Sequence, residues 1–566
     1  MSTPVQTSQP PLGYFAVWQR LMRGYGPLAV FALMILLMSV LVPSKVPDKT
    51  NLASRSGSGS SSGASGAGSG ATGPETVVTT PEGGAAATEG TPGEAGAAGG
   101  GEAAAPGTGG GCPDRAEQVP SDPYSPPCIA FAGSNGGGTS KGVSDTSIKV
   151  AYRVLNEKGF QQTLAQLAGA SLSDSPDSVT RTVQALADYF NERFQLYGRK
   201  IEIVFYDGRG SNTNELLGKG REQAVADAIQ VSEEIGAFAD LSGTSEPYAG
   251  ALADRGVIAF GTPYLSRKWH EEHAPNAWSI ATDGSIVSEF AAEYAVQKLY
   301  GGNAVHAGGA LRDKPRVFGT LAPENSWYQE SVDNAEIVIK EAGQQPGYRR
   351  AYELNLGTMS NQATQIINDF KDRGITTLLC GCDPIIPVFL SGVANREQYY
   401  PEFIIVGTAL TDADIVGQLW NQNFASHAFG VSPLDSFVPP TQTIAYAAYK
   451  SVRDDEPAFS VDLIYYQMYM LAIGLQMAGP DLNPQTFEAG MFNYPPKSGP
   501  FGLWDFGPGD RTAANDVREI YWDAGAVSTY NGQQGSYIAA NDGARFQKGQ
   551  IPDADPGRPV DVGLTP

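Results

Sequence analysis

The chain has 566 residues, with 60 acidic against 38 basic side chains and a formal net charge of −22 at pH 7. This charge has the wrong sign for binding phosphates through lysine and arginine, so nucleic acid is not an expected partner. Four cysteines and four histidines are too few for a disulfide scaffold or a Cys- or His-rich metal site, and no cofactor is expected. The hydrophobic content of 41% is sufficient for a large core.

An uncharged apolar run near the N-terminus, Leu28–Val42, reaches with its neighbours the length of about 20 residues that a membrane helix requires. It predicts a transmembrane helix over 25–44, preceded by a cytoplasmic or interfacial segment over 1–24. No A-x-A-like site follows the run, which favours an uncleaved anchor over a signal peptide. Residues 45–111 are rich in Gly, Ser and Ala and predict a disordered tether. The folded part is then expected outside the cell membrane, at a bacterial surface or in the periplasm.

The four cysteines form two pairs with different expectations. Cys112 and Cys128 lie in a lead-in segment over 112–144 and bracket a Pro- and Ser-rich loop. A disulfide between them, closing a loop of about 15 residues, would stabilise the fold by roughly 3 kcal/mol; two unpaired thiols are the alternative. Cys380 and Cys382 are one residue apart at the end of an apolar run. This spacing makes an awkward disulfide ring, so buried or cavity-lining free thiols are expected there.

From about Asp145, short β-branched runs alternate with helical patterns. The alternation predicts an α/β fold with parallel sheets covered by helices on both faces. Its length exceeds what one core covers, so two doubly wound lobes joined by a hinge are expected. Their predicted bounds are 145–305 for lobe I, 306–435 for lobe II, 436–530 for crossover helices and C-terminal strands, and 531–566 for a tail. Strands are predicted at Ile148–Val154, Ile201–Asp207, Ala237–Leu241, Val257–Gly261, Arg316–Leu321, Thr376–Cys380 and Phe403–Gly407.

A second apolar run covers Val461–Ala478. Asp462, Gln467 and Gln476 interrupt it, and Gly479-Pro480 ends it early. These interruptions favour a buried helix between the lobes over a second membrane span.

Signatures of catalysis are weak. The chain has no G-x-S-x-G elbow and no G-x-x-x-x-G-K-[ST] loop. The best metal candidate, His270-Glu271-Glu272-His273, lacks the H-E-x-x-H spacing, and a solvated charged helix end is the favoured interpretation. The chain is therefore predicted not to be an enzyme, with a cell-surface metallohydrolase as a minor alternative.

Polar loops follow several predicted strands, at the place where ligands bind in open α/β sheets. They are Ser242–Pro247, Thr262–Tyr264, Pro323–Tyr328, Cys382–Pro384 and Thr408–Asp412. Hydroxyls and free N–H groups at the first loop would bind a carboxylate without a lysine. Ordinary N-capping by Ser245 is the alternative interpretation.

Several phrases carry a family resemblance: IKVAYRV, IEIVFYD, SGTSEP, ALADRGVIAFGTP, RVFGTLAPENSWYQESV and EFIIVGTALTD. They and the order of elements resemble the type I periplasmic binding proteins of the leucine/isoleucine/valine-binding kind, which are receptors of ABC importers. The resemblance covers about Ser147 to Tyr530 and implies two lobes that close on a ligand. It also implies that the turn Ser242–Ser245 holds a ligand carboxylate, that Thr262–Tyr264 adds hydrogen bonds, and that Trp327 or Tyr328 closes on the ligand from lobe II.

One departure from the family bears on the ligand. Amino-acid-binding members place a carboxylate where this chain has Thr408-Ala409-Leu410, and a buried ammonium group without a counter-charge is costly. Asp383 or Asp412 is the candidate replacement, and amides, short acids and aromatic compounds stay open as ligands. The predicted ligand-binding residues are Ser242, Gly243, Thr244, Ser245, Thr262, Tyr264, Trp327, Tyr328, Cys382, Asp383, Thr408 and Asp412.

These observations predict a membrane-tethered, extracytoplasmic solute-binding receptor. It would capture a small polar molecule, such as an amino acid, an amide or a small organic acid, and deliver it to the permease of an ABC importer. The alternative with the same fold is a membrane-tethered ligand sensor that acts on a signalling partner.

Overall fold

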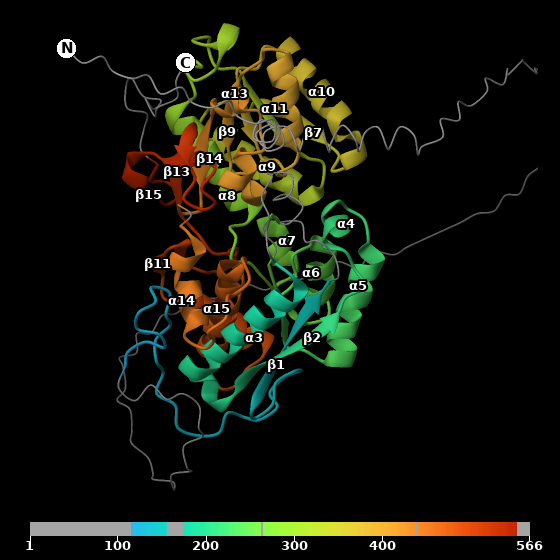
Figure 1. Ribbon diagram of the computed structural model, residues 1–566, viewed down its shortest axis with the longest axis vertical. Coiled ribbons are helices and arrows are strands. Elements are labelled where there is room, and N and C mark those ends of the chain that lie inside the picture. The colour runs from blue at the N-terminus through green and yellow to red at the C-terminus, as the bar shows by residue number, and fades with distance from the viewer. Residues whose placement is uncertain (1–114, 156–173, 262–263, 437, 552–566) are drawn as a thin grey trace, which may run out of the picture. The chain divides into compact units, whose positions relative to one another are not determined.

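The computed structural model describes residues 115–155, 174–261, 264–436 and 438–551. The predicted N-terminal segment, transmembrane helix and tether all lie outside the described residues. Within the described ranges, no helix combines the length and apolarity needed to cross a bilayer. The predicted α/β fold with parallel sheets is confirmed, and its elements are shown in Figure 1.

Lobe I is built on a parallel sheet with the strand order β2-β1-β3-β4-β5. Its strands are β1 Ser147–Val154, β2 Lys200–Asp207, β3 Ala239–Asp240, β4 Ile258–Phe260 and β5 Ala277–Trp278. The helices between them are α3 Pro176–Arg193, α4 Asn212–Leu216, α5 Arg221–Ile229, α6 Glu246–Ala253 and α7 Arg267–Glu272. Strands β1 to β4 overlap the apolar and β-branched runs that predicted them, because buried parallel strands require such runs; β5 was not predicted.

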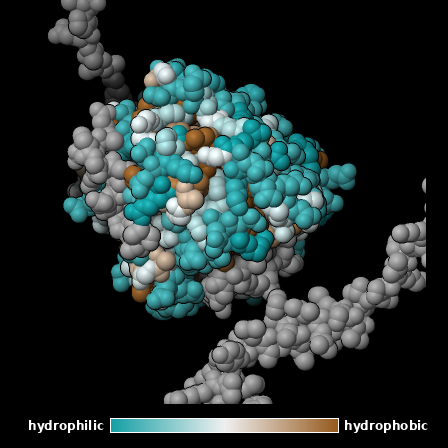
Figure 2. Space-filling view, turned by 90° about the horizontal axis from the view of Figure 1, so that it is seen from above, coloured by the Kyte–Doolittle hydropathy of each residue, from teal (hydrophilic) through white to brown (hydrophobic). Residues whose placement is uncertain are grey.

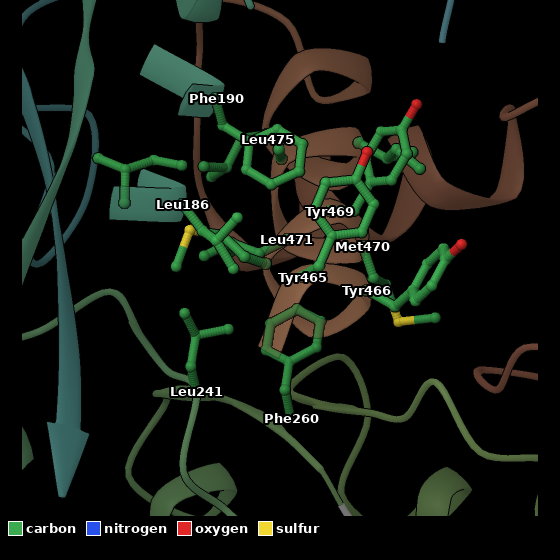
Figure 3. Packing of buried hydrophobic residues seen from close by; sticks show 14 of the residues in the cluster. Leu186, Phe190, Leu241, Phe260, Tyr465, Tyr466, Tyr469, Met470, Leu471 and Leu475 are labelled. Carbon is green, nitrogen blue, oxygen red and sulfur yellow. The ribbon is translucent and has the colours of Figure 1, made fainter. Parts of the chain in front are cut away.

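Three later helices complete lobe I: α14 Ile444–Lys450, α15 Val461–Met477 and α16 Pro484–Phe492. The hairpin of β11 Lys497–Gly499 and β12 Gly502–Trp504 follows them. The helix predicted from the second apolar run is α15, which is buried along most of its length. Figure 3 shows its side chains beside those of α3 and beside Leu241 and Phe260, and the ring of Tyr469 lies 5.2 Å from that of Phe190.

Lobe II has a mixed sheet with the order β14-β13-β10-β9-β8-β6-β7, and β15 also pairs with β13. The parallel strands are β6 Phe318–Pro323, β7 Tyr348–Tyr352, β8 Thr377–Cys380, β9 Glu402–Ile405 and β10 Ala428–Ser432. Antiparallel strands β13 Val517–Val527, β14 Gln534–Ala539 and β15 Arg545–Phe546 extend it. The helices are α8 Gly284–Lys298, α9 Ser326–Glu341, α10 Leu356–Asp372, α11 Ile386–Arg396, α12 Asp414–Gly417 and α13 Gln422–Ala425.

Two predicted boundaries differ from the structure. The segment 531–566 was expected to be a tail, but β14 and β15 place its first part in the sheet of lobe II. Helix α8 was expected in lobe I, but Phe290 and Tyr294 belong to a core cluster with Ile404 and Phe429 of lobe II. The helix is buried on nearly all sides, including at Glu289 and Glu293, so its sequence pattern does not indicate which sheet it covers.

The chain passes between the lobes in several segments. The first lies before α8, where Ser279 pairs in parallel with Thr512 of a later crossing. Asp283 donates its backbone N–H to the Thr512 hydroxyl at 3.1 Å, and the Thr282 hydroxyl donates to the Ala513 carbonyl at 3.0 Å. Another crossing leads from β10 to α14. The two lobes are therefore connected by crossing segments that lie next to each other.

Most of one face of the folded part is hydrophilic, with hydrophobic residues in small separate spots (Figure 2). The exposed large hydrophobic residues come from widely separated parts of the sequence: Phe131, Val317, Ile337, Leu356, Val438 and Val527. Single exposed apolar residues are normal on soluble domains and indicate no docking surface.

Candidate functional site

A cavity of about 790 Å³ is lined by residues of both lobes. Leu155, Ser242 and Gly261 contribute to it after the ends of β1, β3 and β4, while Asn325 and Leu354 do so after β6 and β7. The cavity therefore lies at the carboxyl ends of strands from two sheets, the usual ligand position in open α/β folds. Its volume is within the range of about 300–1,000 Å³ that small-molecule sites occupy.

Half of the predicted ligand-binding residues line this cavity: Ser242, Thr244, Tyr264, Trp327, Tyr328 and Asp383. Thr262 lies outside the described residues. The other predicted residues, Gly243, Ser245, Cys382, Thr408 and Asp412, are described but are absent from the cavity lining. They follow the same strands as the lining residues, so their side chains point into the surrounding fold.

The hydroxyl groups of the Ser242–Ser245 turn are already used as donors. Ser242 Oγ donates to Asp240 Oδ1 at 2.7 Å and accepts from the backbone N–H of Arg153 at 2.8 Å. Thr244 Oγ1 donates to Asn212 Oδ1 at 3.1 Å. The Ser245 side chain makes no capping bond to α6 and instead donates to a carboxylate in the lobe. A hydroxyl carries one proton, so in this geometry none of the three can also donate to a ligand carboxylate.

A buried ion pair that was not predicted forms the wall beside this turn. Arg153 Nη2 lies 2.9 Å from Glu215 Oε2, and the two side chains are 1% and 0% exposed. Arg153 also reaches Asp227 Oδ2 at 3.3 Å and lies over the ring of Tyr248. Burial opposes the charge of Arg153, but the hydrogen bonds from Glu215 raise its pKa overall. The sequence contained a signal for this ion pair. Arg153 is a charged residue inside the predicted strand Ile148–Val154, and a buried charge requires a partner.

On the lobe II side, Asp383 is held in place by the protein. Its Oδ1 accepts the Ile385 N–H at 2.7 Å and the Ile386 N–H at 3.3 Å. Its Oδ2 accepts the Tyr352 hydroxyl. Burial raises the pKa of Asp383 despite these hydrogen bonds. Asp383 thus orders the start of α11 and is a constrained counter-charge for a ligand ammonium group.

The expectation of free thiols beside Asp383 is wrong. Cys380 and Cys382 are joined by a disulfide, and their Cα atoms are 5.0 Å apart, within the range that a disulfide spans. Burial of both residues was predicted correctly. Cys128 is also disulfide-bonded, but Cys112 lies outside the described residues, so the Cys112–Cys128 pair stays a prediction.

The loop after β9 does not provide the missing ligand carboxylate. Ala409 and Leu410 line the cavity, while Thr408 and Asp412 are buried next to them. Asp412 Oδ2 accepts the Ser432 hydroxyl at 2.5 Å, and burial raises its pKa to about 6. The residues of this loop that reach the cavity are therefore apolar.

Aromatic and amide side chains supply the uncommitted polar groups of the cavity. Tyr264 of lobe I and Tyr328 of lobe II stack with ring centres 5.9 Å apart. The indole N–H of Trp327 and Oδ1 of Asn325 are buried without hydrogen-bond partners among the described residues. Asn325 is the N-cap of α9, and its side chain makes no capping bond.

Gln467 of α15 is a lining residue that sequence reasoning missed. It is 5% exposed, and its amide has no hydrogen bond within the described part of the chain. Gly261, at φ +100°, makes room for it, because a Cβ there would lie 2.6 Å from Gln467 Nε2. A glutamine inside a long apolar run was the available signal, since a buried amide requires partners.

The histidines of the metal candidate belong to α7. The ring of His270 is buried, with Nδ1 at 3.3 Å from the Ala277 carbonyl, and burial lowers its pKa to about 4. His273 Nδ1 lies 2.8 Å from the Trp269 carbonyl. No group of three His, Cys, Asp or Glu side chains in the described ranges is placed to hold a metal ion. The metallohydrolase alternative receives no support from this arrangement.

Comparisons with known proteins agree with this architecture. The solved structures that match include an amino acid ABC transporter substrate-binding protein from Pseudomonas fluorescens, at 11% identity and a TM-score of 0.50, with 71% of this chain and 96% of that chain covered. Another is a solute binding protein of an ABC transporter from Rhodopseudomonas palustris in complex with 3,4-dihydroxybenzoic acid, at 12% identity and a TM-score of 0.48, with 73% and 99% covered. Such low identities concern the fold alone. A comparison with curated protein sequences finds no match.

The family is identified by the sequence itself. A family profile described as periplasmic binding protein matches residues 164–526, a span that includes most of both lobes and the crossing segments. This match and the two-lobed fold agree with the resemblance of the sequence phrases to receptors of ABC importers. The chain belongs to the periplasmic binding protein family.

Proposed function

We propose that this chain captures a small molecule in the cavity between its lobes and delivers it to the permease of an ABC importer. The observation that carries the proposal is the cavity of about 790 Å³ with walls from both lobes. Binding there would hold the lobes together, since one ligand would contact lining residues of both lobes, such as Tyr264 and Tyr328. The proposal includes no covalent chemistry.

A ligand screen tests capture directly. Full-length protein in lipid nanodiscs is heated with amino acids, amides, small acids, sugars and aromatic compounds. A compound at about 100 times its Kd adds roughly 2.7 kcal/mol of stability, which raises the Tm by a few degrees. A screen without any stabilising compound, on protein shown to be free of bound solute, contradicts the receptor function.

Hinge closure is the mechanical part of the proposal. The crossing segments at Ser279 and Thr512 are hydrogen-bonded to each other, so the lobes would move as rigid bodies about them. Small-angle scattering with a saturating hit from the screen should give a smaller radius of gyration than the free protein. Equal radii at saturation contradict closure.

Anchoring is a separate proposal that rests on the sequence. We propose that the apolar run Leu28–Val42 holds the protein at the membrane with its folded part outside the cytoplasm. Full-length protein should stay with membranes after carbonate extraction, and a variant without residues 1–44 should not. Release of the full-length protein by carbonate contradicts the anchor.

A further inference from the structure

The buried charged side chains that line the cavity form ion pairs or hydrogen bonds with other groups of the protein. Arg153 and Glu215 share two hydrogen bonds, at 2.9 and 3.1 Å, and both are buried. Asp383 accepts two backbone N–H groups and the Tyr352 hydroxyl. Among the lining residues that the structure describes, neither lobe therefore offers an unpaired buried charge to a ligand.

The remaining charged lining residues are capping groups or lie at the solvent edge. Asp174 accepts the backbone N–H groups of Phe459 and Ser460, at 2.5 and 3.1 Å, just before α15. Arg221 is 71% exposed and lies 3.4 Å from Glu246. Lys219 is also exposed. The positive charges at this edge are hydrated, and Glu246 offsets one of them.

In contrast, the buried lining groups that lack a partner within the described residues are neutral, apart from Nε of Arg153, whose guanidinium charge is already paired with Glu215 and Asp227. The Gln467 amide, the Trp327 indole N–H and Oδ1 of Asn325 have no hydrogen bond within the described residues. Gln467 is the most informative, because it is more than nine-tenths buried and still lines the cavity. An unpartnered buried amide costs free energy unless a ligand or water satisfies it.

Another part of the cavity lining is apolar. It comes from α3, the crossing segments after β5 and β10, α15 and the β11–β12 hairpin. Its lining residues are Val179, Ile280, Leu434, Leu463, Ile464 and Phe501. An amino-acid side chain would leave much of this surface in contact with water, whereas a longer apolar group would cover it.

We propose that the ligand is an uncharged, largely apolar molecule whose hydroxyl, carbonyl or amide group binds Gln467, Trp327 and Asn325. A ligand carboxylate would meet hydroxyls that already donate elsewhere, next to Glu215 and Asp240. A ligand ammonium group would meet buried carboxylates, such as Glu215 and Asp383, that already accept hydrogen bonds from the protein. Either charge would lose hydration without a matched partner, a cost that a neutral group of the same size avoids. This inference rests on the proposed solute-binding function.

A matched series of probes tests the charge preference. Isothermal titration calorimetry on full-length protein in lipid nanodiscs compares 4-phenylbutanamide, 4-phenylbutanoate and 4-phenylbutylamine at pH 7, with empty nanodiscs subtracted. The three compounds share one apolar body and differ in charge. We expect the amide to bind at least tenfold more tightly than the acid or the amine.

Two variants test the role of Gln467. Gln467→Leu keeps the size of the side chain but removes its hydrogen bonds, and it should weaken amide binding about tenfold. Gln365→Leu changes an exposed glutamine of α10 and should leave binding unchanged. Melting curves show that both variants are folded.

The outcomes separate this inference from the function on which it rests. Equal or tighter binding of the acid, the amine or a zwitterion such as leucine overturns the uncharged ligand and leaves the receptor function standing. Amide binding that is unchanged in Gln467→Leu overturns the assignment of Gln467. Failure of the series and of the whole solute screen overturns both the inference and the receptor function.

Discussion

The buried carboxylate of Glu215 is the most sensitive point of the cavity wall. Its side chain is 0% exposed and accepts two hydrogen bonds from Arg153, one from the Ser211 N–H at 3.1 Å and one from the Ser245 hydroxyl. Glu215→Ala removes these acceptors together and leaves a buried guanidinium group with Asp227 as its remaining carboxylate partner. Breaking a buried pair from one side costs about 3–5 kcal/mol, so we expect a loss of that size.

Urea unfolding followed by circular dichroism measures this loss. Glu397→Ala is the matched control, because Glu397 pairs with Lys371 at 3.0 Å with both side chains 45% exposed, and exposed pairs contribute about 0–1 kcal/mol. The double variant Arg153→Met with Glu215→Leu should lose less than the sum of its single variants, since it leaves no unpaired arginine. A loss below about 1 kcal/mol for Glu215→Ala, equal to the control, would refute the reasoning.

Other predictions concern the cavity, the hinge and the disulfide. Gly261→Ala should lower the Tm and weaken amide binding, because its φ of +100° disfavours a side chain and its Cβ would meet the Gln467 amide; unchanged calorimetry and melting would contradict this. Burial, opposed by its capping bond to α8, raises the pKa of Asp283 from the usual 3.8 to about 7. Folding stability should therefore fall as the pH rises from about 4 to 7, by up to about 1.4 kcal/mol per pH unit. Asp283→Asn keeps the cap, and its melting curves should lack this decline. Alkylation in denaturant without reductant should leave Cys380 and Cys382 unmodified in mass spectra, and labelled thiols there would show that the disulfide is absent.

Strands and helices that short apolar runs indicate were predicted at the correct place in the chain. The strands β1, β2 and β8 lie where β-branched and apolar runs predicted them, because buried parallel strands require such runs. The apolar run that became α15 was interpreted correctly as a buried helix. The family was also identified from phrases along both lobes, and the family profile confirms it.

Side-chain partners within the loops were harder to predict. The positions of Ser242, Thr244 and Tyr328 in polar loops after strands indicated that they would line a cavity, and they do. The loops alone gave no indication that the hydroxyls of Thr244 and Ser245 would donate to Asn212 and Glu215, because these acceptors come from another segment.

The α/β class, seven of the strands and the position of the loops that meet at the cavity could be predicted from the sequence. These features depend on the periodicity of apolar residues and on the ends of strands, which are local properties. The placement of α8 in lobe II, the joining of β14 and β15 to its sheet and the pairing of Cys380 with Cys382 became known from the folded structure. It also brought Gln467 of a late helix beside Gly261 of an early loop. Contacts between distant segments depend on how whole elements pack, and no short stretch of sequence contains that information.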